Sequence, residues 1–274
     1  MKTYTIGVDL GGTNIKAGLV DEVHHIVDSV SCKTNLPRPE HEVEAEIAAL
    51  CSQLAQRAGL DMATQIESVG IGTPGSVNPH TGVVEFNANF GYRNWPLVSA
   101  MEKLLPCRVY IENDANAAAY GEYIAGAAQG AKYAIAVTLG TGIGGGIIID
   151  GKIYGGFNFA GAELGHTVIM VDGELCTCGR FGCWEAYASA TALINQTRRA
   201  MVNHPDSAMW SIAEDLDKVN GRTAFDGMRA GDAVAAQVVD TYIKYIATGL
   251  INVINIFQPE VLCIGGGICK EGDT

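Results

Sequence analysis

The residues best suited to chemistry lie close together between positions 163 and 185. Cys176, Cys178 and Cys183 form a C-x-C-x4-C pattern, and His166 lies ten residues before the first of them. One imidazole nitrogen and three thiolates are the ligands of a closed, tetrahedral structural zinc site. The chain has 8 cysteines in 274 residues; spread evenly, they would place only about 0.2 in an eight-residue window. Chance explains this cluster poorly, so these four residues are predicted zinc ligands.

Acidic residues border the predicted metal site. Glu163 and Glu185 are not needed as zinc ligands, and a carboxylate can accept hydrogen bonds from two neighbouring hydroxyl groups. The segment therefore predicts a rigid wall that binds a polyol. A further acidic position, Asp114, follows Glu112 and Asn113 at the start of a predicted helix. Asn and Asp are also favoured as helix caps, so these residues alone leave capping and function open.

Two glycine-rich turns could bind phosphate. Residues 9–21, DLGGTNIKAGLVD, predict a β-hairpin with its tip at Gly11-Gly12, and residues 137–152, VTLGTGIGGGIIIDGK, repeat that design. Backbone N–H groups at such tips can approach phosphate closely because glycine has no Cβ. One such turn could be an ordinary hairpin. The pair predicts a duplicated architecture, in which two similar lobes each offer a phosphate-binding hairpin to a shared cleft.

The remaining elements are the scaffold that must position these residues. Glycines 265–267 follow a predicted buried strand and add a third glycine-rich tip, whereas residues 203–222 are polar and are expected to be variable. Apolar spacing predicts helices over 42–58, 95–105, 115–128, 184–200 and 233–257, and strands over 3–9, 15–20, 66–72, 107–111 and 260–264, with two strands and a turn over 134–149.

Composition excludes several classes of protein. The net charge of −12 opposes binding to nucleic acid, which requires clustered Lys and Arg. The N-terminus lacks a long apolar stretch, and glycines interrupt the most apolar segment, so neither a signal peptide nor a membrane span is predicted. Clustered cysteines that read as metal ligands are typical of a reducing compartment, and we expect a cytoplasmic protein.

The pattern E-x-G-H followed by C-x-C-G-x-x-G-C-x-E resembles the signature of the ROK (repressor, open reading frame, kinase) sugar kinases, and the resemblance covers almost the whole chain. It implies an α/β protein with the two-lobed actin-like sugar-kinase ATPase superfold, in which ribonuclease H-like lobes are duplicated and one carries a zinc-binding loop. The expected lobes are residues 1–114 and 115–274. Relatives usually continue with a further helical segment, so a closing C-terminal segment is expected to be missing. Relatives are also commonly homodimers.

The resemblance implies roles for individual residues. Asp114 is the expected general base, ATP the phosphoryl donor, and Mg²⁺ the nucleotide's metal, with Asp9 as the nearby carboxylate. His166 is expected to bind zinc through one ring nitrogen and sugar through the other. The expected sugar contacts are Gly75, Asn89, Asn113, Asp114, Glu163, His166 and Glu185. The expected nucleotide contacts are Asp9, Gly11, Gly12, Thr13, Asn14, Thr141, Gly142, Gly265, Gly266 and Gly267.

The implied activity is ATP-dependent phosphorylation of a hexose at its 6-hydroxyl, with glucose as the first candidate. Kinases for N-acetylmannosamine, N-acetylglucosamine, fructose or allose are alternatives. A sugar-responsive repressor is disfavoured, because the first strand begins within five residues of Met1 and the net charge is −12. A non-catalytic sugar-binding protein is disfavoured by the retained Asp9, glycine tips and Asp114. A zinc-ribbon-like structural module explains the cysteines but not the paired hairpins.

Overall fold

The computed structural model describes residues 3–87 and 89–272, and its chain divides into two compact units. Unit 1 comprises Met1–Gly121 and Ile153–Gly161, and unit 2 comprises Glu122–Lys152 and Ala162–Thr274. The expected lobe boundary after residue 114 falls at the first residue of helix α3 (Asp114–Ala125), whereas the change of unit falls later in the same helix. Residues 153–161 also return to unit 1.

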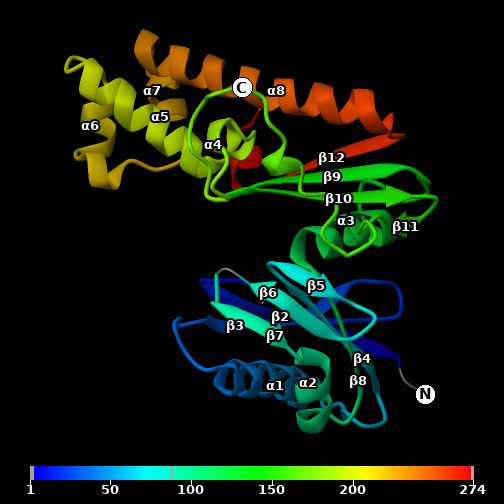
Figure 1. The fold of residues 1–274 in the computed structure, drawn as a ribbon. Coiled ribbons are helices and arrows are strands. Elements are labelled where there is room, and N and C mark those ends of the chain that lie inside the picture. Colours follow the sequence, from blue (N-terminus) through cyan, green and yellow to red (C-terminus); the bar gives the residue numbers. More distant parts are fainter. Residues whose placement is uncertain (1–2, 88, 273–274) are drawn as a thin grey trace. The chain divides into compact units, whose positions relative to one another are not determined.

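Unit 1 is built on a five-stranded sheet of order β3-β2-β1-β4-β8. Strand β1 pairs antiparallel with β2 and parallel with β4, which in turn pairs parallel with β8. Side chains of β1 alternate between a buried face with Ile6, Val8 and Leu10 and an exposed face with Asp9. Helices α1 and α2 pack on this sheet (Figure 1). The elements are β1 (Tyr4–Leu10), β2 (Asn14–Val20), β3 (Ile26–Lys33), β4 (Ile66–Thr73), β8 (Arg108–Asn113), α1 (Glu40–Arg57) and α2 (Leu97–Leu104).

A second, three-stranded sheet in unit 1 was not predicted. Its strands are β5 (Ser76–Asn78), β6 (Val83–Asn87) and β7 (Tyr92–Trp95). They are short, and the turns between them contain Gly82 and Gly91, both at positive φ. Trp95 ends β7 fully buried, and its Nε1 donates to Glu44 Oε1 of α1 at 2.7 Å. The predicted helix after this tryptophan is α2, which starts at Leu97.

Unit 2 repeats the strand arrangement of unit 1. Its sheet has the order β11-β10-β9-β12, in which β9 pairs antiparallel with β10 and parallel with β12. In both units an antiparallel hairpin therefore has a later, parallel strand on the other side of its first strand. This is the duplication that the two glycine-rich turns predict. The strands are β9 (Ala134–Leu139), β10 (Ile143–Ile149), β11 (Lys152–Ile153) and β12 (Val261–Gly266).

Helix α8 (Ala233–Phe257) has the predicted bounds. The Asp232 carboxylate caps it, because Oδ1 accepts the N–H groups of Val234 at 2.7 Å and Ala235 at 3.2 Å. Although α8 has 25 residues, no helix within residues 3–87 and 89–272 combines the length and hydropathy that a membrane span requires.

The prediction of one helix over 184–200 was wrong. The chain forms α4 (Glu185–Ala188) and α5 (Ala190–Asn203), separated by Ser189 in an extended conformation. Ser189 Oγ accepts the Ala192 N–H at 3.1 Å, which makes it the cap of α5. Elements also occur in and around the polar stretch for which none was predicted. These are α6 (Met209–Ala213), the 3₁₀ turn η2 (Leu216–Lys218) and α7 (Thr223–Arg229).

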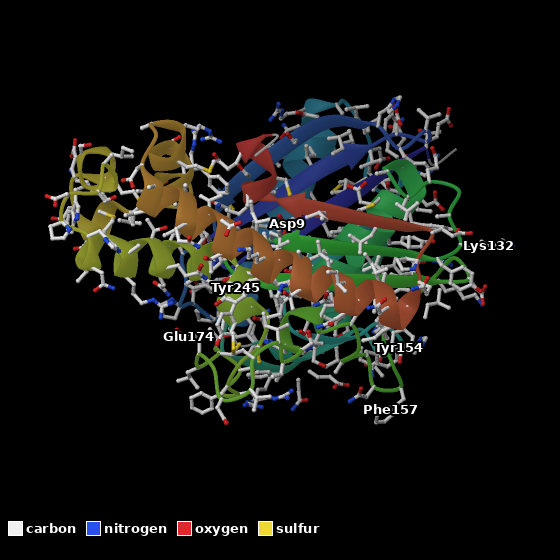
Figure 2. All side chains as sticks on the ribbon, turned by 90° about the horizontal axis from the view of Figure 1, so that it is seen from above. Asp9, Lys132, Tyr154, Phe157, Glu174 and Tyr245 are labelled. Carbon is white, nitrogen blue, oxygen red and sulfur yellow. The ribbon has the colours of Figure 1, made fainter. Side chains whose placement is uncertain are left out.

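Trp184 fixes the cysteine-rich loop to the core of unit 2. The indole is fully buried, and its Nε1 donates to the Tyr245 carbonyl in α8 at 2.9 Å. Tyr245 is labelled on α8 in Figure 2. Gly249 leaves the space that the indole occupies, since a Cβ there would lie 2.0 Å from Trp184 Cε2. Trp184 stands between Cys183 and Glu185, so this contact positions two predicted site residues.

We therefore expect Gly249→Ala to lower the free energy of unfolding by about 1–3 kcal/mol, because the new methyl group overpacks a core that cannot yield easily. Thermal and urea unfolding would measure it. The matched control is Gly121→Ala in α3, where a new Cβ meets nothing within 4 Å. That change should raise stability by about 0.5–1 kcal/mol. Equal stability of the two variants would show that the indole contact is not tight.

Candidate functional site

The first glycine-rich hairpin is closed tightly at its tip. The Gly11 N–H donates to the Asn14 carbonyl at 3.0 Å, so the four predicted phosphate-binding residues from Gly11 to Asn14 form one compact turn between β1 and β2. Gly12 and Thr13 are exposed. Asp9 lies at the same end of β1, with Oδ2 3.5 Å from Lys16 Nζ. Both of these side chains are more than half exposed, so their ion pair contributes little to stability.

Asp114 lies at the same edge of the sheet as Asp9. Strands β1, β4 and β8 run parallel, and their register places Asp9 beside Gly72 and Thr73 beside Asn113, immediately before Asp114. Desolvation by the surrounding protein raises the pKa of the Asp114 carboxyl, and the negative charge of Asp9 raises it further. The Ala115 N–H, 2.9 Å from Asp114 Oδ1, opposes the shift. The carboxyl therefore keeps its proton to a higher pH than an ordinary aspartate.

Asn113 is a helix cap, as one of the two interpretations of this position predicted. Its Oδ1 accepts the N–H groups of Ala115 at 3.0 Å and Asn116 at 3.2 Å. Its Nδ2 donates to the Gly75 carbonyl at 3.1 Å, which brings two of the predicted sugar contacts together. The second hydrogen of Nδ2 is the one that the predicted sugar contact would use.

Gly75 can only be glycine. Its φ is +99°, and a Cβ would lie 2.2 Å from the Phe86 carbonyl oxygen in β6. The three-stranded sheet thus lies against the turn that follows β4.

Asn87 positions the loop that carries Asn89, a role that the sequence argument did not identify. Its side chain is fully buried, and Oδ1 accepts the N–H groups of Asn89 at 3.1 Å and Phe90 at 3.2 Å. Its Nδ2 donates to Thr73 Oγ1 at 3.3 Å. Asn89 in turn lies beside the hairpin tip, because a Cβ on Gly12 would be 3.7 Å from Asn89 Cβ. The recurrence of asparagine in Asn87-x-Asn89 was the available signal.

The four predicted metal ligands do converge in unit 2. The ligand atoms of His166, Cys176, Cys178 and Cys183 all lie within 4.8 Å of one another. His166 Nδ1 is 3.6 Å from Cys176 Sγ, and Cys178 Sγ is 3.7 Å from Cys183 Sγ. Tetrahedral zinc with ordinary bond lengths separates two sulfurs by about 3.8 Å, and a sulfur from a nitrogen by about 3.5 Å. The donor set and its spacing therefore fit such an ion.

The thiols of Cys178 and Cys183 lie in different environments. Burial raises the pKa of Cys183 to about 12, whereas the Arg180 N–H lowers the pKa of the exposed Cys178. The loop that carries them turns at Gly179 and Gly182, both at positive φ. No side chain fits at Gly182, where a Cβ would lie 1.7 Å from the Met170 carbonyl oxygen. Glycine is therefore required at Gly182 for the loop to close.

Glu185 joins the cysteine-rich loop to the second glycine-rich hairpin. Its Oε2 accepts the Ile143 N–H at 2.9 Å, and its Oε1 accepts the Thr177 hydroxyl at 2.9 Å. The absence of a Cβ on Gly142 makes this approach possible, since one would lie 2.3 Å from Glu185 Oε2. This contact between hairpin and carboxylate was not predicted. Glu185 still has lone pairs for a sugar hydroxyl, because a carboxylate offers about four acceptor positions.

Other predicted residues gather around the same hairpin. Glu163 is exposed just before the 3₁₀ turn η1 (Leu164–His166). Gly165 in that turn packs on β10, where a Cβ would lie 2.4 Å from the Ile143 carbonyl oxygen. Gly266, at the end of β12 and φ +110°, packs equally closely on Leu139, the last residue of β9. The 3₁₀ turn η3 (Gly267–Glu271) follows directly. Thr141, Gly142 and Gly265–Gly267 therefore lie at one edge of the unit 2 sheet.

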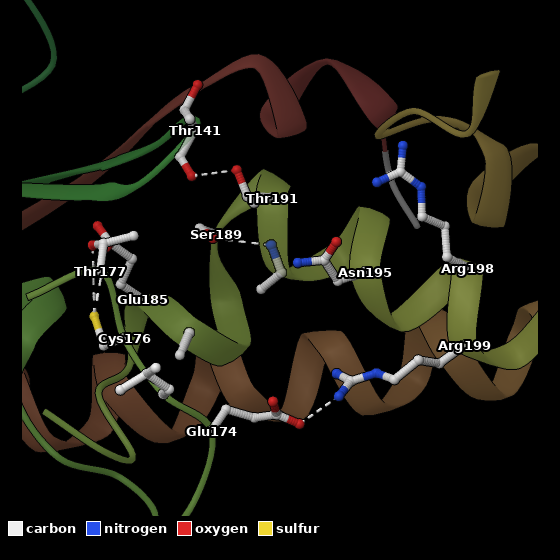
Figure 3. A pocket seen from close by; sticks show the side chains of 13 residues that line it. Thr141, Glu174, Cys176, Thr177, Glu185, Ser189, Thr191, Asn195, Arg198 and Arg199 are labelled. Atoms are coloured by element: carbon white, nitrogen blue, oxygen red, sulfur yellow. Dashed lines mark hydrogen bonds and ion pairs between the residues drawn. The ribbon is translucent and has the colours of Figure 1, made fainter. Parts of the chain in front are cut away.

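A pocket of about 550 Å³ opens beside these residues in unit 2 (Figure 3). Three of its lining residues were predicted, namely Thr141, Cys176 and Glu185. The polar lining that was not predicted comes mainly from α5. Arg199 Nη1 pairs with Glu174 Oε1 at 2.5 Å, and Arg198 Nε donates to the Leu216 carbonyl at 2.9 Å. The other polar lining residues are Thr177, Ser189, Thr191 and Asn195.

Comparison with known proteins places this geometry in a family. The model of the ROK family matches residues 5–274. A glucokinase of Thermotoga maritima is 37% identical over 273 residues, which cover 99% of this chain and 84% of the relative. A glucokinase of Streptomyces coelicolor is 38% identical over 272 residues, 98% of this chain and 83% of the relative. The crystal structure of a ROK family glucokinase from Streptomyces griseus in complex with glucose and AMPPNP matches with a TM-score of 0.84 and 37% identity, over 98% of this chain and 85% of that one.

Proposed function

This chain belongs to the ROK family, and from that membership we propose that it is an ATP-dependent glucokinase. It transfers the γ-phosphoryl group of ATP to the 6-hydroxyl of glucose. The observation that carries the proposal is the identity of 37% to 38% to curated glucokinases over almost the whole chain. The match to a solved glucokinase that holds glucose and AMPPNP supports both substrates.

Asp114 acts as the general base in this proposal. Its carboxylate accepts the proton of the 6-hydroxyl as that oxygen attacks the γ-phosphorus and the bond to the β-phosphate oxygen breaks. Its place at the carboxyl end of three parallel strands supports the role, because ligands of α/β sheets bind at such ends. The raised pKa is suited to a base that must take up a proton during the reaction.

In each unit, the backbone N–H groups of the glycine-rich tip, at Gly11–Asn14 and at Thr141-Gly142, are the candidate contacts for the phosphates of ATP. Mg²⁺ supplies positive charge to the phosphate oxygens when it is bound, and Asp9 is the carboxylate that would hold it, directly or through water. The exposed position of Asp9 beside the first tip supports this assignment. The turn at Gly265–Gly267 contacts the adenosine, in keeping with its place next to the second tip.

The candidate sugar contacts are assigned within each unit by itself. Unit 1 contributes Asn89 and the Asn113 amide, together with the backbone at Gly75. Unit 2 contributes the carboxylates of Glu163 and Glu185 and the free Nε2 of His166. His166 Nδ1 lies close to Cys176 Sγ, which supports the assignment of Nδ1 to the metal and Nε2 to the sugar.

The homodimer expected from the family resemblance stays a prediction. Light scattering would measure the oligomeric state.

The function predicts ADP release that depends on glucose. A panel of glucose, mannose, fructose, allose, N-acetylglucosamine and N-acetylmannosamine, each with ATP and magnesium, should give the highest kcat/KM for glucose. Preference for an acetylated sugar would keep the kinase and replace its substrate. Binding of glucose without turnover of any sugar would instead favour the sugar-sensing alternative.

A second prediction concerns pH. A general base is active only when deprotonated, and the pKa of Asp114 is raised, so kcat/KM for glucose should begin to fall at a higher pH than an ordinary aspartate would give. Below that pKa the loss is about tenfold per pH unit. Asp114→Asn should lower kcat by about 10²- to 10⁴-fold while glucose still binds. Asp61→Asn, which removes a surface carboxyl in unit 1, should change neither quantity. An unchanged kcat in Asp114→Asn would exclude this residue as the base.

A third prediction concerns the metal. We propose one structural Zn²⁺ per chain at His166 and the three cysteines, which elemental analysis of the purified protein would detect. Cys178→Ser should lose the zinc and lower the thermal midpoint together, because binding energy of the ion is folding energy for the loop. Cys269→Ser removes an exposed thiol elsewhere and should retain both. A Cys178→Ser protein that lacks zinc yet keeps full stability and activity would disprove a structural metal.

A further inference from the structure

The carbonyl groups of the two glycine-rich tips accept hydrogen bonds in the same arrangement. In unit 1, Thr34 Oγ1 donates to the Gly11 carbonyl at 2.6 Å, and the Thr34 N–H donates to the Thr13 carbonyl at 3.0 Å. In unit 2, Thr191 Oγ1 donates to the Thr141 carbonyl at 2.8 Å, and the Ala190 N–H donates to the Gly140 carbonyl at 2.8 Å. Each tip thus has two carbonyls bound by one threonine hydroxyl and one backbone N–H.

The threonines come from unrelated elements. Thr34 directly follows β3 and is fully buried, whereas Thr191 is the second residue of α5 and is exposed in the pocket (Figure 3). Each tip is also closed from within by a similar bond. Gly11 N–H donates to the Asn14 carbonyl at 3.0 Å, and Gly140 N–H donates to the Gly142 carbonyl at 3.0 Å. The same arrangement therefore occurs twice, although the elements that complete it differ.

Binding the carbonyls determines where the neighbouring N–H groups point. In a planar trans peptide the carbonyl of one residue and the N–H of the next point in opposite directions. With the carbonyls of Gly11 and Thr13 turned toward Thr34, the N–H groups of Gly12 and Asn14 are directed away from it. By the same geometry, the N–H groups of Thr141 and Gly142 are directed away from the start of α5. These four residues are among those expected to bind phosphate.

We propose that Thr34 and Thr191 are paired positioning residues, which hold the tip carbonyls back so that the tip N–H groups face the phosphates of ATP. The inference rests on the proposed phosphoryl transfer and adds two residues to its machinery. In this proposal both threonines act through the tip carbonyls that they bind. Without the hydroxyl, the Gly11 carbonyl loses its partner and its peptide can rotate, so the N–H groups are no longer preorganised.

The test is calorimetric titration of the full chain with MgATP. Thr34→Val and Thr191→Val keep the shape of the side chain and remove the hydroxyl, and each should weaken MgATP binding by about three- to tenfold, the range of one ordinary hydrogen bond. Thr34→Ser and Thr191→Ser should restore wild-type affinity. The matched control is Thr197→Val, which removes a fully buried hydroxyl that donates to the Leu193 carbonyl at 2.8 Å. It should bind MgATP as the wild type does.

Glucose affinity is measured on the same variants and should not change. Equal weakening for glucose and MgATP, or weakening in Thr197→Val as well, would indicate general loss of structure and overturn the inference. If Thr34→Val does not fold, the exposed Thr191→Val still decides the question.

Binding of MgATP needs no phosphoryl acceptor, so the test is separate from that of the proposed function. Wild-type affinity in both valine variants would overturn the positioning role, even if the protein phosphorylates glucose efficiently. Weakened MgATP binding in both, with serine rescue, would support it even if no sugar in the panel is turned over. A wild-type chain that does not bind MgATP would overturn both proposals.

Discussion

Parallel pairing beside an antiparallel hairpin is the constraint on which the candidate residues of each unit depend. In unit 1, β4 and β8 run parallel to β1, so the chain returns to the same edge each time and leaves Asp9, the turn after Thr73 and Asp114 together. In unit 2, β12 runs parallel to β9 and ends beside the second glycine-rich tip. Residues far apart in the chain meet there because the carboxyl ends of parallel strands share one edge of a sheet.

The cysteine-rich loop is held in place by contacts of three consecutive residues. Cys183 faces His166 and the other two clustered cysteines, Trp184 enters the core against α8, and Glu185 accepts the N–H of Ile143. A loop with little secondary structure of its own is thereby fixed at three points. The cluster of His166 and the three cysteines, the hydrophobic core and the second glycine-rich hairpin of unit 2 are therefore mechanically connected through a single short stretch of backbone.

Local patterns predicted the parts of the structure that local chemistry determines. The cysteine spacing and His166 identified the four residues that converge, and the glycine-rich turns identified both hairpins. Apolar periodicity predicted the first and last residues of α8 correctly. The features that were not predicted correctly depend mostly on contacts with residues distant in the chain. The break at Ser189 lies within a helical pattern, where the serine competes as a cap and the Ala190 N–H bonds to Gly140 instead. The sheet of β5, β6 and β7 has strands too short for a periodic signal. The hydrogen bond from the Ile143 N–H to Glu185 could not be predicted, because it requires Gly142 to lie against the Glu185 carboxylate in the folded chain.

Two glycines in unit 2 each leave the space that one particular neighbouring side chain occupies. Gly142 accommodates the Glu185 carboxylate and Gly249 the Trp184 indole. At such a pair, neither residue can vary by itself, because a methyl group on the glycine collides with its neighbour. Losing the larger partner leaves a void or an unpaired donor instead. Divergence at the paired side chains must therefore proceed by compensated double substitutions, which are rare. We infer that these pairs limit the single substitutions that a lineage can accept at Glu185 and Trp184, so that the second glycine-rich hairpin and the cysteine-rich loop change together.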